Sequence, residues 1–258
     1  MKLALIGYGR MGQAVEALAT ARGHQIAAVI DPAATGRARR RLTPRALEHA
    51  EVCLEFTRPE AAADNVIALC RMNQRVVVGT TGWYDRLDEV AAEVKAHKAA
   101  VLYGANFSIG VNLFYRLVAR AVELFGELPE RDLYIAEAHH RGKADAPSGT
   151  ARHLAEIVIE GCPHKSLQAP LGLGRRIRED ELCVASIRAG WIPGTHRVGI
   201  ESPHDAIVLE HQARSREGLA EGALRAAQWL LDAAPGLYRF EDVLDGVLAV
   251  QSATPDGD

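Results

Sequence analysis

Short apolar runs alternate with amphipathic segments through roughly the first hundred residues of the chain. Runs of strand length occupy residues 3–6, 26–30, 52–56, 75–78 and 100–103. Between them, apolar residues recur at helical spacing over residues 11–22, from residue 59 to about 70, and over about 85–98. Thr57 and Glu60 match a capping box at the start of the second of these helices. The alternation predicts an α/β fold with a Rossmann-like, doubly wound parallel sheet.

The pattern changes near residue 108, where a second domain of α+β type is predicted to begin. A helical pattern over residues 111–125 is followed by an apolar run that ends at residue 136, and then by a second helical pattern over residues 151–160. Three longer runs, residues 182–189, 197–201 and 207–213, are typical of antiparallel strands. Ser215 is expected to cap a last amphipathic helix that extends to about residue 231.

A glycine-rich turn joins the first predicted strand to the first predicted helix. It follows the GxGxxG pattern with Gly7, Tyr8, Gly9, Arg10, Met11 and Gly12. Gly7 permits a tight turn, Gly9 lets the backbone approach a pyrophosphate, and Gly12 lets the helix pack closely on the sheet. Asp31 ends the second strand at the spacing expected for the acid that bonds an adenosine ribose. Together these features predict a dinucleotide-binding domain.

The sequence leaves the choice of nucleotide open. A carboxylate at Asp31 favours NADH because it repels a 2′-phosphate. Arg37, Arg39, Arg40 and Arg41 follow, and they form either a solvated face or a partner for that phosphate. We therefore expect both NADH and NADPH to serve as cofactor. Two more turns follow predicted strands at the sheet edge where such folds bind ligands, and they supply the candidate cofactor residues Gly79, Thr80, Thr81, Ala105, Asn106 and Phe107.

One polar stretch, residues 137–151 with the sequence EAHHRGKADAPSGTA, concentrates candidate chemistry. Ser148 stands where it can cap the helix that follows, so that the amides of Gly149 and Thr150 face outward and can hold a carboxylate. His139, His140 and Lys143 precede this anion seat, and an imidazole there can supply a proton to the bound molecule. A histidine pair also occurs on ordinary surfaces and in metal sites. The whole constellation, and not the pair alone, predicts a site for a small acidic substrate.

Composition narrows the class of protein. With 258 residues, of which 48% are hydrophobic, the chain can bury the core of one large or two moderate domains. The net charge of −3 gives no general attraction to nucleic acid or to anionic membranes. The cysteines form no CxxC pair, so neither a zinc ribbon nor a redox motif is expected. No signal peptide or long apolar window is found, and a cytoplasmic location is the default expectation.

Residues 137–151 closely resemble the signature of the 4-hydroxy-tetrahydrodipicolinate reductase family. The likeness includes both histidines, the lysine four residues beyond the first of them, and the whole of DAPSGTA. The segments FTRPE, GTTG and ANFSIGVN resemble the same family, and the resemblance covers nearly the whole chain. Two details differ: GYGRMG is one residue shorter than the GxxGRMG form common in the family, and Pro32 follows Asp31 where many members carry arginine.

The resemblance implies an activity, residue roles and an assembly. The activity is NAD(P)H-dependent reduction of 4-hydroxy-2,3,4,5-tetrahydrodipicolinate, a cyclic dicarboxylate, to tetrahydrodipicolinate with loss of water, on the route to diaminopimelate and lysine. His139 would act as acid/base with help from Lys143, while His140, Gly149 and Thr150 would bind the substrate's carboxylates. The resemblance also implies a dinucleotide-binding domain of residues 1–107 and 216–258, and a homotetramer joined through residues 108–215.

Other polar residues near this stretch are assigned structural roles. Asp145 is expected to orient the loop, and Ser148 to cap a helix and not to act as a nucleophile. Arg188 and His196 lie in segments that also match the family, and we interpret them mainly as turn and sheet-packing residues, although both could approach the substrate.

Three alternatives remain open. Another two-domain dehydrogenase would not need DAPSGTA, and a non-catalytic nucleotide sensor would not need His139 and Lys143 together. A zinc hydrolase would need both histidines on one metal, but adjacent residues of a strand point to opposite faces. We therefore expect no metal, no nucleic-acid partner and no membrane partner.

Overall fold

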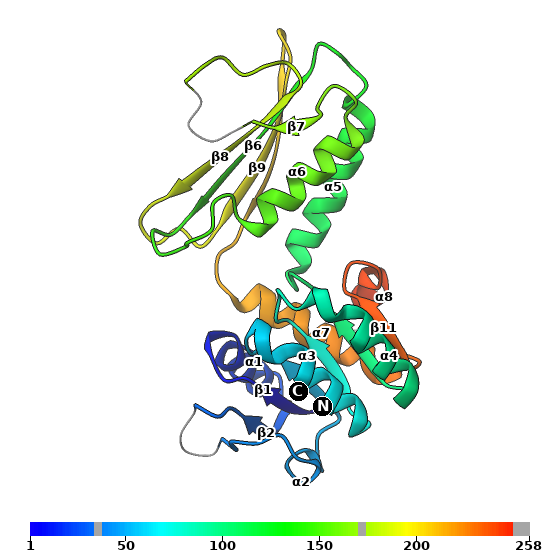
Figure 1. Ribbon diagram of the computed structural model, residues 1–258. Coiled ribbons are helices and arrows are strands. Elements are labelled where there is room, and N and C mark those ends of the chain that lie inside the picture. The colour runs from blue at the N-terminus through cyan, green and yellow to red at the C-terminus, as the bar shows by residue number, and fades with distance from the viewer. Residues whose placement is uncertain (34–37, 170–173, 250–258) are drawn as a thin grey trace, which may run out of the picture. The chain divides into compact units, whose positions relative to one another are not determined.

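The chain folds into two compact units, shown in the computed structural model of Figure 1, which describes residues 1–33, 38–169 and 174–249. Unit 1 comprises Met1–Ile109 together with the chain from Arg216 onward, and unit 2 comprises Gly110–Ser215. Among the described residues, no helix has the length and apolar character needed to cross a lipid bilayer.

Unit 1 is built on a parallel sheet with the strand order β11-β5-β4-β3-β1-β2. Its strands are β1 (Lys2–Ile6), β2 (Gln25–Ile30), β3 (Val52–Glu55), β4 (Arg75–Val78), β5 (Ala100–Tyr103) and β11 (Gly236–Arg239). The chain places β2 on one side of β1 and β3 on the other, so the strand order reverses at β1. Ligands of such sheets bind at this switch point, and the loop after β1 is the glycine-rich turn. The predicted Rossmann-like fold is confirmed.

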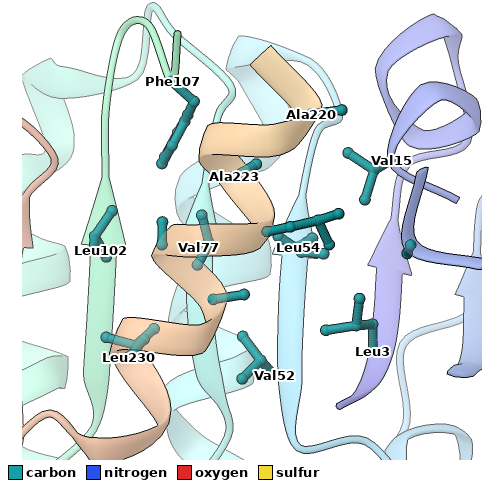
Figure 2. Close-up of a cluster of buried hydrophobic side chains, with 14 of the residues drawn as sticks. Leu3, Val15, Val52, Leu54, Val77, Leu102, Phe107, Ala220, Ala223 and Leu230 are labelled. Carbon is teal, nitrogen blue, oxygen red and sulfur yellow. The ribbon is translucent and has the colours of Figure 1, made fainter. Parts of the chain in front are cut away.

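Helices cover both faces of this sheet (Figure 1). One face packs against α1 (Arg10–Ala21) and α7 (Glu217–Asp232), and the other against α3 (Pro59–Arg71) and α4 (Leu87–His97). Ala220, Ala223 and Leu230 of α7 lie over Leu54 and Val77 of the central strands (Figure 2). Because alanine side chains are short, α7 approaches the sheet closely. Short helical segments complete the unit: α2 (Pro44–Leu47), the 3-10 turn Tyr84–Arg86 and α8 (Leu244–Ala249).

Two helix starts differ from the prediction. The N-cap of α3 is Arg58, and Thr57 does not open a capping box; its hydroxyl instead donates to the buried carboxylate of Glu55. The N-cap of α7 is Arg216 and not Ser215. At Thr57 the neighbouring buried carboxylate of Glu55 displaced the capping motif, because a buried carboxylate costs more to leave without donors than a helix start does.

Unit 2 is built on a mixed sheet with the strand order β10-β9-β6-β8-β7. Its strands are β6 (Asp132–His139), β7 (Leu167–Gln168), β8 (Glu181–Arg188), β9 (Thr195–Glu201) and β10 (Ala206–Gln212), and its helices are α5 (Ile109–Phe125) and α6 (Gly149–Gly161). Both helices pack on one face of the sheet (Figure 1), where Phe114 and Leu154 join Ile135, Leu182 and Val198 in the core. The predicted second α+β domain is confirmed.

The prediction that β8 is antiparallel was wrong. β8 pairs with β6 in parallel, while β9 pairs with the other edge of β6 in the antiparallel sense, as predicted for it and β10. Residues 189–194, which connect β8 to β9, must therefore pass across the carboxyl end of β6, and Ala189 N donates to the carbonyl of His139 there. This crossing brings a loop from elsewhere in the sequence to the histidine stretch.

Candidate active site

Glu137 and His139 are buried side by side on the face of β6 that the helices cover. The alternation that buries Leu133 and Ile135 places Glu137 and His139 on the same face, since successive strand residues point to opposite sides. His140 is the next residue, so the alternation assigns it to the opposite side, and it is half-buried. A strand that begins as core therefore ends as a polar site.

Arg188 binds both oxygens of the Glu137 carboxylate. Its Nη1 donates to Oε2 at 2.9 Å and its Nη2 to Oε1 at 2.6 Å, which is a bidentate ion pair. The sheet register produces this contact, because Arg188 on β8 is the direct partner of His139 on β6. Burial opposes ionisation of Glu137, but the hydrogen bonds, led by those from Arg188, outweigh it and lower the pKa of Glu137 to about 2. Glu137 is ionised at neutral pH.

His139 is hydrogen-bonded through Nδ1 to Oε2 of Glu137. Burial lowers the pKa of His139, and the positive charges of Lys143 and Arg188 act in the same direction against the opposing effect of Glu137. The ring is therefore mostly neutral at pH 7, yet it has a carboxylate beside it that stabilises the protonated form. A group of this kind can exchange a proton with a bound substrate.

His196 and Ser148 form a second polar pair beside this ring. His196 lies opposite Glu137 on β9, and its ring meets that of His139 edge to face with centroids 5.0 Å apart. Ser148 Oγ accepts from the amide of Ala151 at 3.2 Å, and it is also hydrogen-bonded to Nε2 of His196 at 3.0 Å. Burial, followed by the neighbouring His139, lowers the pKa of His196 to about 4. His196 is consequently neutral at pH 7.

The structure therefore brings Arg188 and His196, which the sequence analysis treated mainly as packing residues, directly beside His139. A signal for them was present in the sequence. Polar side chains stand at alternate positions of three otherwise apolar runs, and the parity of each puts the side chain on the core-facing side. This signal can be interpreted only when it is known which strands pair with one another, and hydrophobic periodicity does not give the strand pairing.

Lys143 lies in the loop between β6 and α6 and is paired with Asp145, with Nζ 2.7 Å from Oδ1. The backbone oxygen of Asp145 accepts from Nη2 of Arg188 at 2.5 Å. Asp145 thus connects the loop to the Glu137–Arg188 pair, and it does so as the loop-orienting residue that the sequence suggested. The Lys143 side chain is 26% exposed.

The amino end of α6 has the geometry of an anion seat. Ser148 is the N-cap, as predicted, and Gly149 and Thr150 form the first turn. Gly149 is exposed, and a Cβ added there would meet no atom within 4 Å. Open space therefore lies beside Gly149 in the first turn of α6.

The glycine-rich turn of unit 1 fits a dinucleotide. Gly7 has a φ of +92°, and a Cβ on Gly12 would lie 2.4 Å from the Gly7 carbonyl oxygen, so both positions require glycine. A Cβ on Gly9 would meet nothing within 4 Å, which leaves space for a pyrophosphate at the start of α1. Asp31 accepts from the amides of Tyr8 and Ala33, both at 2.8 Å, and thereby fixes the carboxylate at the end of β2.

The arginine segment runs beside Asp31. Arg39 pairs through its backbone with the end of β2: Arg39 N donates to Val29 O at 2.8 Å, and Asp31 N donates to Arg39 O at 2.9 Å. Arg37 lies outside the described residues. Tyr8, Arg10 and Met11 occupy the turn and the first residues of α1.

The two later cofactor segments carry several residues with structural partners. Thr80 is buried and its Oγ1 accepts from Thr57 N at 2.8 Å, while a Cβ on Gly79 would strike the Phe56 ring. Phe107 is buried against Phe240, with ring centroids 4.7 Å apart. Gly79, Thr80 and Phe107 can therefore offer a ligand mainly their backbone groups. Thr81, Ala105 and Asn106 lie next to them in the same two segments.

Glu137, His139 and His196 form a group of three residues whose potential metal-ligand atoms lie within 4.8 Å of one another. Both oxygens of Glu137 already accept from Arg188, and a guanidinium at this place repels a cation. The arrangement favours an ion pair over a metal site. His140 is not a member of this group in the part of the chain that the structure describes.

Comparison with known proteins gives consistent matches for both parts of the chain. The family model described as dihydrodipicolinate reductase, N-terminus, matches residues 1–107, and the model described as dihydrodipicolinate reductase, C-terminus, matches residues 110–244. A protein of Christiangramia forsetii named 4-hydroxy-tetrahydrodipicolinate reductase is 35% identical over 245 residues, which cover 95% of this chain and 98% of that protein.

Solved structures agree at the level of the fold. The dipicolinate-bound dihydrodipicolinate reductase from Paenisporosarcina sp. TG-14 is similar with a TM-score of 0.76 and 21% identity, over 94% of this chain and 99% of that one. A probable dehydrogenase from Thermotoga maritima has a TM-score of 0.57 and 13% identity, over 96% of this chain and 94% of that one.

Proposed function

The chain belongs to the dihydrodipicolinate reductase family, and we propose that it reduces 4-hydroxy-2,3,4,5-tetrahydrodipicolinate to tetrahydrodipicolinate with loss of water. The reaction is a step in the biosynthesis of diaminopimelate and lysine, and the proposed location is the cytoplasm. The observation that carries the proposal is the grouping of His139, Lys143 and the amino end of α6 in one part of unit 2.

His139 is the proposed acid/base residue. A reduced nicotinamide supplies a hydride when bound, and the reduced ring also needs a proton, which His139 is placed to give. Lys143 stabilises negative charge that develops on the substrate, and its positive charge also acts on the imidazole. Glu137, which is bonded to Arg188, holds the ring through Nδ1.

The substrate's two carboxylates are assigned to the anion seat and its neighbours. Gly149 and Thr150 offer backbone amides at the positive end of α6, which bind a carboxylate without adding a group that titrates. His140, half-buried at the end of β6, is the third proposed contact. A cyclic dicarboxylate matches this set better than a neutral aldehyde or an amino acid would, because the seat offers donors to carboxylates.

NADH and NADPH are both proposed as cofactors, held by Gly7, Tyr8, Gly9, Arg10, Met11, Gly12 and Asp31, with Gly79, Thr80, Thr81, Ala105, Asn106 and Phe107 beside the nicotinamide. Asp31 suits the ribose of NADH. The backbone of Arg39 pairs with that of Asp31, and Arg39, Arg40 and Arg41 are the proposed partners of the 2′-phosphate of NADPH.

A homotetramer joined through unit 2 is the proposed assembly. On the face of the unit 2 sheet opposite α5 and α6, Ile187 and Val208 are 55% and 47% exposed. Large apolar side chains that are exposed on a sheet face favour association with another surface. Sedimentation of the purified protein tests this: a monomer at micromolar concentration would contradict it.

The activity is tested by mixing the purified protein with the substrate and either nucleotide. We expect the absorbance of the reduced nicotinamide to fall and tetrahydrodipicolinate to appear in equal amount by mass spectrometry. No nucleotide oxidation with this substrate would overturn the proposal, and faster oxidation with an amino acid or an aldehyde would favour a different dehydrogenase.

A further inference from the structure

The carboxylate of Glu137 is fully buried, and it is surrounded by hydrogen-bond donors and the His139 ring. Arg188 donates two hydrogen bonds, and the amide of Ser148 donates a third to Oε1 at 3.3 Å. Nδ1 of His139 also contacts the carboxylate. Arg188 is itself fixed, because it also donates to the carbonyls of Ile187 and Asp145. The carboxylate therefore has one orientation relative to the imidazole.

This bonding determines which nitrogen of His139 carries the permanent proton. A carboxylate paired with a guanidinium can only accept hydrogen bonds, so the group facing it must be a donor. Nδ1 is consequently the N–H nitrogen, and the neutral ring has its lone pair on Nε2. The exchangeable proton of the imidazolium is then the one on Nε2.

Gly194 borders Nε2. A Cβ at position 194 would lie 3.0 Å from Nε2 and 3.2 Å from Cδ2 of His139, and the φ of +149° also favours glycine. Any side chain at this position would crowd the nitrogen that Glu137 leaves available. Residues 189–194, the loop that crosses the end of β6, thus leave space beside Nε2 of His139.

We propose that Glu137, held by Arg188, is a positioning residue that keeps His139 in the Nδ1–H tautomer and makes Nε2 the atom that transfers the proton. The inference rests on the proposed function. Over the reaction, the hydride from the reduced nicotinamide and the proton from Nε2 both pass to the substrate, whose hydroxyl group leaves as water. The imidazolium becomes neutral imidazole with its Nδ1–H bond intact, and it regains a proton from solvent for the next turnover. The same division of roles operates wherever a buried carboxylate orients a catalytic imidazole.

The charged and titratable groups around the ring are few. Glu137 lies on the same strand, Arg188 on β8, His196 on β9, and Lys143 on the following loop. Among them only Glu137 favours the imidazolium, since the others are cationic or become so. Glu137→Gln should therefore shift the pH dependence of kcat toward lower pH.

The kinetic test compares Glu137→Gln with the unchanged protein across pH. We expect kcat to fall by at least about 10-fold while the Kd for NADH stays the same, because the variant side chain lies in unit 2. We also expect the decline of kcat with rising pH to begin at a lower pH, because the imidazolium has lost its stabilising neighbour. A merely structural role would reduce the amount of folded protein but would not move the profile.

Glu93 provides a matched control. On α4 it accepts from Arg71 at 2.6 and 3.1 Å and lies 3.3 Å from Nε2 of His97, so it forms a second arginine–glutamate–histidine group, away from the site. Glu93→Gln should leave kcat and the pH profile unchanged. If Glu137→Gln matches this control in both, Glu137 does not position His139.

The tautomer itself can be measured without substrate. In protein labelled with ¹⁵N-histidine, NMR distinguishes Nδ1–H from Nε2–H, and a His139→Gln variant assigns the signals. We expect His139 to be the Nδ1–H form above its pKa. An Nε2–H form would overturn the inference even if Glu137→Gln fails to fold. Absence of reductase activity in the unchanged protein would instead remove the proposed function and leave the tautomer result standing.

Discussion

Ser148 Oγ is hydrogen-bonded to Nε2 of His196 across 3.0 Å, and the same oxygen accepts from the first turn of α6. One side chain therefore connects the anion seat at the start of a helix to the ring that packs against His139. The helix start, the β9 strand and the histidine stretch are held as a single arrangement.

Replacing Ser148 by alanine should lower the free energy of unfolding by about 1 to 2 kcal/mol, because it removes an N-cap and the hydrogen-bond partner of a buried imidazole nitrogen. It should also reduce turnover, since the amides of α6 lose their fixed position. Urea unfolding and steady-state kinetics measure the two effects. Thr43→Ala is the control: Thr43 caps α2 in unit 1, and its loss should affect stability without affecting kcat. Unchanged stability of Ser148→Ala would contradict the N-cap role.

Stability should fall as pH falls from about 6.5 to 4. His196 has a pKa of about 4 in the folded protein and an ordinary value of 6.5, so the unfolded chain binds more protons between these values. At about 1.4 kcal/mol for each pKa unit, His196 accounts for about 3 kcal/mol that is present above pH 6.5 and lost toward pH 4. Unfolding free energies in this range should show a shallower slope for His196→Gln, and an equal slope would rule out His196 as the source.

His139→Gln should reduce kcat by about 100-fold or more, because glutamine cannot give a proton at neutral pH. The Kd for NADH should remain nearly the same, as the change lies in unit 2. His153→Gln is the comparison, since His153 is an exposed histidine on α6 that pairs with Glu156. Full activity of the His139 variant in the reductase assay would exclude this residue from the mechanism.

Lys143→Ala should also lower kcat by about 100-fold through the loss of a positive charge that stabilises the reacting substrate. The pKa of Asp145 is held down chiefly by the hydrogen bond from Lys143, against the opposing effect of burial, so the variant should raise it. Lys95→Ala on α4 serves as a control with the same change of charge. If both lysine variants retain the parent kcat at saturating substrate, Lys143 takes no part in the chemical step.

Replacing Arg39, Arg40 and Arg41 together by alanine should weaken NADPH binding by about 10-fold and leave NADH binding unchanged, because a guanidinium pairs with the 2′-phosphate only in NADPH. Fluorescence titration with each nucleotide gives the two dissociation constants. Equal weakening for both nucleotides would indicate a general effect on the fold of this segment and would contradict a specific phosphate contact.

The sequence by itself determined the Rossmann-like fold, the position of the glycine-rich turn and the cap at Ser148. These features depend on neighbours in the chain: a strand followed by glycines, and a helix preceded by a serine, carry their information within about ten residues. The family resemblance likewise rested on the contiguous stretch that contains His139 and Lys143.

Only the tertiary structure decided that Arg188 binds Glu137, that His196 meets His139 and that Gly194 borders Nε2. These contacts join residues some 50 or more positions apart, and they exist because β8 pairs in parallel with β6 while β9 occupies its other edge. Hydrophobic alternation predicts which face of the sheet a strand residue occupies. The alternation of a strand is the same whichever strand lies beside it, so it does not predict the neighbour. Strand order, which periodicity does not encode, therefore placed Arg188 and His196 beside Glu137 and His139.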